Sequence, residues 1–439
     1  MARVILGVGA GIAAYKACEL LRLFKESGHS VRVIPTPDAL RFVGAPTWEA
    51  LSGEPVTTDV WTGVADVPHV KLGQTADLVI VAPATADLLA RAAAGMSNDL
   101  LTATLLTARC PVVYAPAMHT EMWEHPATRH NVATLRARGT IVVDPAVGRL
   151  TGKDSGKGRL PEPAGLFLLA EKLIGYGTDS ARRPSPPVAF TAGEADPAGE
   201  AESAGDGNPG ALLDGNPLPL TGRTVLISAG GTREELDPVR FLGNWSTGRQ
   251  GYAFATAAVA LGADVTLVAA NVELTDPAGV KVVPVVSARD MHAAMMAEAP
   301  RADVIVMTAA VADFRPVTRA EAKIKKDGSG AIPPPIELAE NPDIVVALSA
   351  RRREHGPEGQ LIVSFAAETD PDLDAARAKL ARKGSDYQVV NRVGGGQGFG
   401  RGDNEWVVLG ADGTVRDISR RSKEALADEV LALVTARLS

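Results

Sequence analysis

Short apolar runs alternate with longer amphipathic stretches along most of the chain. In the first part, runs of four to six mainly apolar residues are typical of strands, and they alternate with stretches of helical spacing such as 12–27 and 125–138. Strands that alternate with helices form parallel sheets with helices on both faces. The pattern therefore predicts a doubly wound α/β domain with strands at residues 3–8, 31–34, 77–82, 111–115 and 140–143.

The pattern stops near residue 177 and resumes near residue 220. The stretch between is rich in glycine, proline, alanine, serine and acids and has little to bury, which predicts a flexible linker. Beyond it lie a helix expected at 247–261, a C-terminal helix, and strand candidates at 223–228, 264–269, 303–308, 361–366, 386–390 and 404–410. We expect two doubly wound, Rossmann-like α/β domains at 1–176 and 220–439, joined by a linker at 177–219.

Charge and cysteine content exclude several classes of protein. The formal net charge is −7 over 439 residues, so the chain lacks the basic excess that a nucleic-acid backbone requires. No segment is long and apolar enough to span a bilayer. Cys18 and Cys110 are the two cysteines and lie far apart in sequence, so neither a disulfide framework nor a thiolate metal site is expected. These features favour a protein of the reducing cytoplasm, and any polyanion that it binds should be small.

Loops at the carboxyl ends of parallel strands carry the ligand site in such folds. Gly9 and Gly11 follow the first strand and weakly match the dinucleotide fingerprint, and helix-start amides there favour a phosphate. A nicotinamide cofactor predicts an acid at the end of the second strand, where this chain has Thr36. A nicotinamide-dependent oxidoreductase thus rests on the glycine turn alone. Visible flavin absorbance would distinguish a flavoprotein from it.

Four motifs of the first half resemble the flavin-dependent cysteine decarboxylases. These are AGIAAYK, PATAD, PHVKL and PAMHTEMW. The resemblance covers roughly residues 3–175. It is specific to the amino-terminal half of the bifunctional phosphopantothenoylcysteine decarboxylase and phosphopantothenate–cysteine ligase family of coenzyme A biosynthesis. It implies an FMN cofactor bound by Gly9, Gly11, Ile12, Thr36, Pro83, Ala84 and Thr85.

The resemblance also implies a reaction. The thiol end of the substrate is oxidised to a thioaldehyde by FMN, the neighbouring carboxylate leaves, and the enethiol is reduced by the same flavin. His69 is the favoured proton acceptor. The family has asparagine after PAM, whereas this chain has His119, whose imidazole can still donate a hydrogen bond to the departing carboxylate. Met118 is expected to form an apolar wall of the substrate site.

The stretch GRLTGKDSGKGRL departs from the family's flap sequence GxLACGxxGxGR. The family cysteine thought to protonate the intermediate falls at Thr151 or Gly152, and neither residue has a thiol. We expect the proton to come from Thr151, Lys153, Asp154, Ser155 or water held by them, with Lys153 and Asp154 favoured because alcohols are weak acids. The alternative is an active ligase fused to a flavoprotein half that is non-catalytic or decarboxylates only oxidatively.

From about residue 222 to the end, the chain resembles the ligase half of the same family. The motifs AGGTREELDPVR, GNWSTGRQG, AAVADFRP, KIKK, NPDI and FAAET occur in order. The resemblance implies that the acid attacks CTP to give an acyl cytidylate, from which the amine of cysteine displaces CMP, with Mg²⁺ neutralising the triphosphate. A lysine run by itself is more often a solvated surface.

The same resemblance assigns roles to individual residues of the second half. Lys323, Lys379 and Lys383 would contact the CTP phosphates. Ala309 and Asp313 would lie at the nucleotide, and Phe365 would border its base. Asn244 would assist conversion of the acyl cytidylate, and the nucleotide loop would be shaped by Asn341 and Asp343. The ligands of Mg²⁺ are not assigned.

The sequence thus predicts a bifunctional enzyme whose substrates are 4'-phosphopantothenate, cysteine and CTP. The ligase half would make the conjugate that the flavin half then decarboxylates. The resemblance further implies a large homo-oligomer, with trimers of the flavin half joined through dimers of the ligase half. Neither nucleic acid nor a membrane is expected as a partner.

Overall fold

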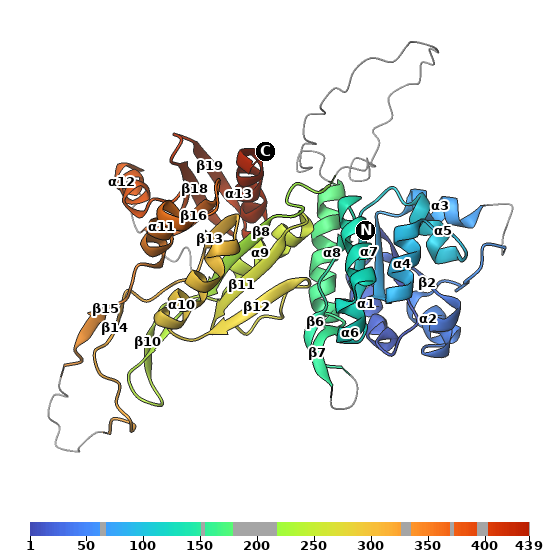
Figure 1. Cartoon of the computed structure of the whole chain (residues 1–439), viewed down its shortest axis with the longest axis horizontal. Coiled ribbons are helices and arrows are strands. Elements are labelled where there is room, and N and C mark those ends of the chain that lie inside the picture. Colours follow the sequence, from blue (N-terminus) through green and yellow to red (C-terminus); the bar gives the residue numbers. More distant parts are fainter. Residues whose placement is uncertain are drawn as a thin grey trace, which may run out of the picture. The chain divides into compact units, whose positions relative to one another are not determined.

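The computed structural model of the protein describes residues 1–61, 67–150, 154–178, 217–325, 335–368, 373–392 and 403–438. The chain folds into two compact units, one from Met1–Thr221 together with Ala260–Gly262 and the other from Gly222–Val259 together with Ala263–Leu438. In each unit helices pack on a sheet (Figure 1). The predicted linker at 177–219 lies almost wholly outside the described residues.

The first unit is built on a parallel sheet. Within its described residues, five strands lie in the order β2-β1-β3-β4-β5, and each neighbouring pair is parallel. The strands are β1 (Arg3–Val8), β2 (Ser30–Pro35), β3 (Leu78–Ala84), β4 (Val112–Pro116) and β5 (Ile141–Val142). An antiparallel hairpin follows, formed by β6 (Ala146–Arg149) and β7 (Ser155–Arg159). The helices are α1 (Ala14–Glu26), the 3-10 helix η1 (Pro37–Arg41), α2 (Ala45–Ser52), α3 (Pro68–Thr75), α4 (Ala86–Ala94), α5 (Leu100–Thr107), α6 (Thr120–Glu124), α7 (Pro126–Ala137) and α8 (Pro163–Thr178).

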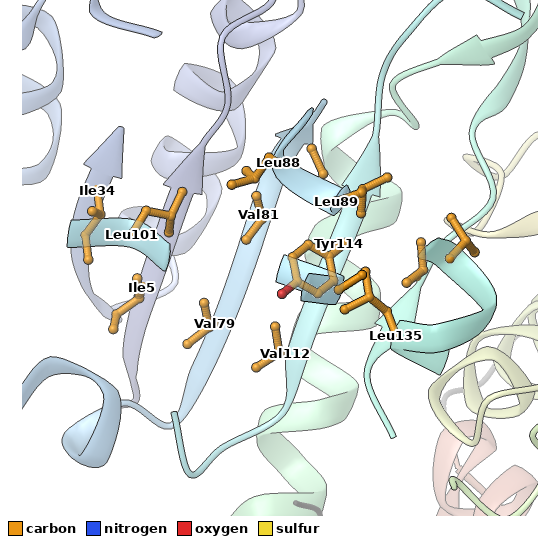
Figure 2. Close-up of a cluster of buried hydrophobic side chains, with 14 of the residues drawn as sticks. Ile5, Ile34, Val79, Val81, Leu88, Leu89, Leu101, Val112, Tyr114 and Leu135 are labelled. Atoms are coloured by element: carbon orange, nitrogen blue, oxygen red, sulfur yellow. The ribbon is translucent and has the colours of Figure 1, made fainter. Parts of the chain in front are cut away.

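Both faces of this sheet are buried under helices. Helices α1, α2 and α8 pack on one face, and α4, α5 and α7 pack on the other. Figure 2 shows Val79 and Val81 of β3 facing the second group, where Leu88, Leu89 and Leu101 meet them. Alternate residues of β3 face the first group and are also fully buried. Because both faces are covered, the strand is a continuous apolar run without polar alternation.

The second unit carries a larger sheet. Within the described residues its order is β12-β11-β8-β13-β16-β17-β18-β19, parallel up to β17 and antiparallel beyond it. The strands are β8 (Thr224–Gly230), β11 (Asp264–Ala270), β12 (Val280–Val285), β13 (Val304–Met307), β16 (Leu361–Glu368), β17 (Tyr387–Arg392), β18 (Asp403–Gly410) and β19 (Val415–Ser422). Two antiparallel ribbons stand apart from this sheet, β9 (Arg233–Glu235) with β10 (Phe241–Gly243) and β14 (Phe314–Pro316) with β15 (Leu338–Glu340).

Helices again cover the second sheet. They are α9 (Arg249–Ala260), α10 (Ala288–Glu298), the 3-10 helix η4 (Ala299–Arg301), α11 (Ile344–His355), α12 (Leu373–Lys383) and α13 (Lys423–Leu438). The apolar side chains of α10 and α11 form one core with β8, β11, β13 and β16. Ser287 starts α10 with a capping box to Asp290, which fixes where the helix begins. The doubly wound prediction is confirmed for both units, with the antiparallel strands β18 and β19 added at one edge of the second sheet.

Candidate active sites

The loop after β1 lies directly against the end of β3. The Gly9 N–H donates a hydrogen bond to the Pro83 carbonyl, with 2.9 Å between nitrogen and oxygen. A β-carbon on Gly9 would lie 2.6 Å from that oxygen, so glycine is required there. In this strand order the winding of the chain reverses between β1 and β3, and ligands bind at the carboxyl ends of the strands there. The predicted cofactor residues Gly9, Pro83, Ala84 and Thr85 therefore lie together.

Thr85 starts helix α4 beside this contact. Its side-chain oxygen accepts a hydrogen bond from the Leu88 N–H at 3.2 Å. The amide groups of the first turn favour an anion. A β-carbon on Gly11 would lie 4.0 Å from the Thr85 methyl group, so Gly11 also belongs to this cluster. The side chain of Ile12, by contrast, is 71% exposed and lies at the surface.

Thr36 follows β2 at the same edge of the sheet. Its N–H donates to the Val8 carbonyl at 2.9 Å, which ties it to the loop after β1. Its side chain is buried, yet the hydroxyl oxygen has no hydrogen-bond partner in the described part of the chain. A buried hydroxyl without a partner is costly unless a ligand completes it. The Thr36 hydroxyl can donate a hydrogen bond to a phosphate such as that of FMN. The contact between Gly9 and Pro83 leaves only backbone in the loop beside it, so a phosphate-bearing chain can approach closely.

His119 lies in the loop after β4. The Ala117 N–H donates to the Ala84 carbonyl at 3.1 Å, so this loop adjoins the end of β3. His119 is the residue before α6, and its carbonyl accepts the Met122 and Trp123 N–H groups at 3.1 Å. The imidazole itself is exposed and makes no capping bond. The imidazole ring is therefore open to solvent, and the neighbouring Met118 is half-buried.

His69 lies on α3, which packs against α5. Its carbonyl accepts a hydrogen bond from the Thr107 hydroxyl at 2.7 Å. Its Nδ1 atom is buried and has no hydrogen-bond partner among the described residues. Figure 1 shows α3 and α6 on different sides of the first unit. The two helices are therefore not neighbours within one chain.

The β6–β7 hairpin carries the predicted proton donors. Thr151 and Lys153 lie outside the described residues, whereas Asp154 is exposed and its carbonyl accepts the Leu150 N–H at 2.8 Å. At the base of the hairpin, Asp144 accepts hydrogen bonds from Arg136 at 2.9 Å and from Lys157. Burial would raise the pKa of Asp144, but the Lys157 hydrogen bond and the Arg136 charge outweigh it and hold the pKa below its usual range.

The sequence analysis did not single out Asp144 or Lys157. Asp144 precedes proline after a short strand, and Lys157 lies between two glycines in the flap stretch. Both patterns are typical of exposed turns, so the sequence did not indicate that the two side chains meet. The one feature that could have drawn attention to Asp144 was its position directly after a buried strand.

In the second unit the loops after β8 and β13 interlock. The Ala310 N–H donates to the Gly230 carbonyl, and the Ala312 N–H donates to the Thr232 hydroxyl, both at 2.8 Å. Asn244 donates from its Nδ2 atom to the Val311 carbonyl at 2.9 Å. The strand order reverses between β8 and β13, where such folds bind nucleotides. Asn244 therefore contacts the loop after β13, which contains Ala309 and Asp313.

The NPDI segment is joined to the same loop. The Asn341 N–H donates to the Asp313 carbonyl, and its Nδ2 atom donates to the Ala312 carbonyl, both at 2.8 Å. Asp343 caps α11 by accepting the backbone N–H groups of Val345 and Val346. Lys383 at the end of α12 forms an ion pair with Asp343, with 3.4 Å between Nζ and Oδ2. Four of the predicted ligase residues thus form one connected group: Asp313, Asn341, Asp343 and Lys383.

Lys323 lies in an exposed loop whose base is anchored by a buried carboxylate. Asp237 accepts hydrogen bonds from Arg240 and from the Ile324 N–H, while Arg240 donates to the Ile324 carbonyl at 2.7 Å. The hydrogen-bonded Arg240 guanidinium holds the pKa of Asp237 well below its usual range, against the opposing effect of burial. Asp237 was not singled out from the sequence, although LDPVR carries the Asp-Pro signal of a turn.

Phe365 lies in an aromatic cluster on the face of the sheet toward α9. Its ring packs edge-on against Phe254 and Trp406, with centroids 5.7 and 6.4 Å apart. This packing stabilises the domain core, and the Phe365 ring is half-buried. Lys379 is half-buried on α12, one helical turn before Lys383.

The described residues contain no group of three or more histidine, cysteine, aspartate or glutamate side chains placed to hold a metal ion. Over the same residues, no helix combines the length and apolar character that crossing a bilayer requires.

Two family models match the chain. One, described as flavoprotein, matches residues 1–173. The other, described as DNA/pantothenate metabolism flavoprotein C-terminal domain, matches residues 220–438. Together they span both folded units.

Known proteins resemble the chain over its full length. The coenzyme A biosynthesis bifunctional protein CoaBC of Mycobacterium tuberculosis is 54% identical, covering 99% of this chain and 96% of that protein. The protein of the same name from Vibrio cholerae is 40% identical over 98% of this chain and 97% of its own length.

A crystal structure of the C-terminal domain of a CoaBC protein is 35% identical, with a TM-score of 0.42, and covers 50% of this chain and 97% of that one.

Proposed function

This chain belongs to the family of bifunctional coenzyme A biosynthesis proteins, and on that premise we propose that its two units catalyse consecutive reactions. The carboxyl-terminal unit joins cysteine to 4'-phosphopantothenate at the expense of CTP. The amino-terminal unit decarboxylates the conjugate to 4'-phosphopantetheine with FMN. Both reactions would take place in the cytoplasm.

FMN would be held along Gly9, Thr36, Pro83 and Thr85, with the Thr36 hydroxyl bonding the bound cofactor. FMN supplies oxidation of the thiol-bearing carbon and later its reduction, so no external oxidant is consumed. His69 takes up the proton released in the oxidation, a role supported by its buried ring nitrogen without a partner. His119 donates a hydrogen bond to the carboxylate that leaves as carbon dioxide. Asp154 or a neighbouring flap residue returns the proton during reduction.

In the ligase unit the carboxylate of 4'-phosphopantothenate attacks the α-phosphate of CTP and releases pyrophosphate. The amine of cysteine then displaces CMP from the acyl cytidylate. Lys323, Lys379 and Lys383, with Mg²⁺, would neutralise the triphosphate. Asn244 would assist the second step, which its bond to the Val311 carbonyl in the Ala309–Asp313 loop supports.

The protein would act as a homo-oligomer, with trimeric flavin units and dimeric ligase units. The separation of α3 from α6 within one chain supports this proposal, because a second copy would have to bring His69 to the His119 loop. The two histidines would then serve one site from different chains.

The observation that carries the proposal is the likeness to CoaBC proteins over 99% of the chain, which includes both folded units.

The test is mass analysis of products after incubation with 4'-phosphopantothenate, cysteine and CTP. We expect 4'-phosphopantetheine, carbon dioxide and CMP. With the variant His69→Asn we expect the undecarboxylated conjugate and retained flavin, because an amide cannot take up the proton at neutral pH. Turnover of the variant at the parent rate would remove His69 from the mechanism.

A second candidate is that the flavin unit decarboxylates only oxidatively. It is favoured by Thr151 and Gly152, which stand where the family has a cysteine. The same mass analysis, run as a single turnover on supplied conjugate, separates the two. A product lighter by the mass of H₂ would identify the oxidative enzyme.

A further inference from the structure

Asp144 joins two parts of the first unit that the sheet itself does not connect. Arg136 of α7 donates to Asp144 at 2.9 Å and also to the Val142 carbonyl at 2.7 Å, so one side of the carboxylate is fixed to the sheet. The other side accepts Lys157, which lies on β7. Of these two cations, Lys157 is the one carried by the hairpin. Its side chain is only about one-third exposed.

Lys157 also lies over a buried aromatic ring. Its Nζ atom is 5.8 Å from the centre of the Trp123 ring. Trp123 itself is fully buried and belongs to α6, the helix that His119 precedes. A lysine can pack its alkyl stem on such a ring while its ammonium group pairs with a carboxylate beyond it. The position of Lys157 is therefore set by two separate contacts.

The backbone of β7 lies directly against the His119 loop. The Met118 N–H donates to the Gly158 carbonyl at 3.0 Å. A β-carbon on Gly158 would lie 2.1 Å from the Met118 oxygen, and one on Gly156 would lie 2.3 Å from the Thr120 hydroxyl. Residues on both sides of His119 thus touch the strand that carries Lys157. Any movement of β7 must move or release this loop.

We propose that the Lys157–Asp144 ion pair holds the β6–β7 hairpin against residues 118–120, and that Lys157 thereby positions His119 for the substrate carboxylate. Lys157 is a positioning residue in this account, since it acts through the hairpin and the loop. The proposal rests on the decarboxylase function proposed above. If the pair is broken, fewer molecules have the loop in its binding position, and apparent substrate affinity falls by that fraction.

The full-length variant Lys157→Met tests this proposal. Methionine keeps an apolar stem on Trp123 and removes the ammonium group, and Asp144 stays paired with Arg136. Lys157→Arg is the conservative variant. Lys172→Met is the matched control, because Lys172 of α8 also lies over an aromatic ring, with Nζ 5.1 Å from the centre of Tyr176.

Two measurements are compared. In amide hydrogen exchange, residues 155–159 should exchange faster in Lys157→Met than in the parent, and at the parent rate in Lys157→Arg and Lys172→Met. In steady-state decarboxylation of supplied conjugate, Lys157→Met should raise KM about tenfold with kcat within about twofold and the flavin spectrum unchanged. Lys157→Arg should restore KM.

Each outcome decides a separate claim. Unchanged exchange in Lys157→Met would show that the ion pair does not hold the hairpin, whatever the activity. Faster exchange with an unchanged KM, or a fall in kcat with loss of flavin, would overturn the positioning role. A parent protein that releases no carbon dioxide would overturn the proposed function instead, and the exchange measurement would still decide whether the pair holds the hairpin.

Discussion

Lys383 at the end of α12 pairs with Asp343, the residue that caps α11, and 3.4 Å separates its Nζ atom from Oδ2. The pair joins a predicted phosphate ligand to the loop predicted to surround the nucleotide. Because Asp343 keeps its bonds to two backbone N–H groups, it can hold the lysine in place while the ammonium group also faces a phosphate.

We predict that Lys383→Gln raises KM for CTP by tenfold or more, since charge-assisted hydrogen bonds contribute about 1.5 to 3 kcal/mol. Unfolding free energy should fall by no more than about 1 kcal/mol. Initial-rate measurements of CMP release against CTP concentration test this. Lys281→Gln, which breaks the Lys281–Glu298 pair, is the control and should leave KM unchanged. An unchanged KM in Lys383→Gln would leave the lysine with a structural role alone.

Asn244→Asp should let the acyl cytidylate accumulate. The carboxylate cannot donate to the Val311 carbonyl as the amide does at 2.9 Å, so the variant loses the contact between Asn244 and the loop proposed to hold the acyl cytidylate. Mass spectrometry of quenched reactions is the measurement. Asn271→Asp, which also removes an amide donor from a neighbouring loop, should lower stability without this accumulation. Product formation by Asn244→Asp at the parent rate would show that the assigned role is wrong.

Gly9→Ala should yield protein that has lost its flavin. The added methyl group would lie 2.6 Å from the Pro83 oxygen, so the loops after β1 and β3 must separate. Absorbance of the purified protein near the flavin bands gives the result directly. Gly175→Ala on α8 meets open space and should retain flavin, with stability equal to the parent or higher. Full flavin content in Gly9→Ala would exclude this loop as the cofactor cradle.

His119→Asn should retain substantial decarboxylase activity, and His119→Ala should lose most of it. Both imidazole and amide can donate a hydrogen bond to the departing carboxylate, whereas alanine leaves that carboxylate unpaired. We expect kcat/KM to fall about tenfold to a hundredfold in His119→Ala. Carbon dioxide release from supplied conjugate is measured. Equal activity of the alanine variant and the parent would remove His119 from the site.

Stability of the second unit should fall in acid partly through Asp237. Its pKa is lowered in the folded protein, so its contribution is complete above the unfolded pKa of about 4 and is lost as pH falls from there toward the folded value. Urea unfolding between about pH 5 and pH 2 measures this. Asp237→Asn should flatten that dependence. Identical slopes for Asp237→Asn and the parent would contradict the assignment.

The sequence predicted the parallel strands well because strands buried on both faces must be apolar throughout. Leu78 to Val81 are all fully buried, and the apolar run marks them unambiguously. The β6–β7 hairpin is different, since SGKGR has no apolar alternation and is held by glycine contacts and one ion pair. Its lysine looks like any solvated charge until the fold brings Asp144 to it.

The placement of the candidate site residues could be predicted only where it depends on the order of the strands. Gly9 and Pro83 could be placed together, because Gly9 follows β1 and Pro83 lies near the end of the neighbouring parallel strand β3. The separation of α3 from α6 could not be predicted, because it depends on where α3 packs and not on any local pattern. The link between Asp343 and Lys383 likewise requires α11 and α12 to lie side by side.

The two sheets have different strand orders, β2-β1-β3-β4-β5 in one and β12-β11-β8-β13-β16-β17 in the parallel part of the other. Numbered within each sheet, the two orders are 2-1-3-4-5 and 3-2-1-4-5-6, so they differ only by the edge strand β12. In both units the winding reverses beside the first strand. Each unit therefore has its own crevice at the carboxyl ends of its central strands, and neither needs the other to form it.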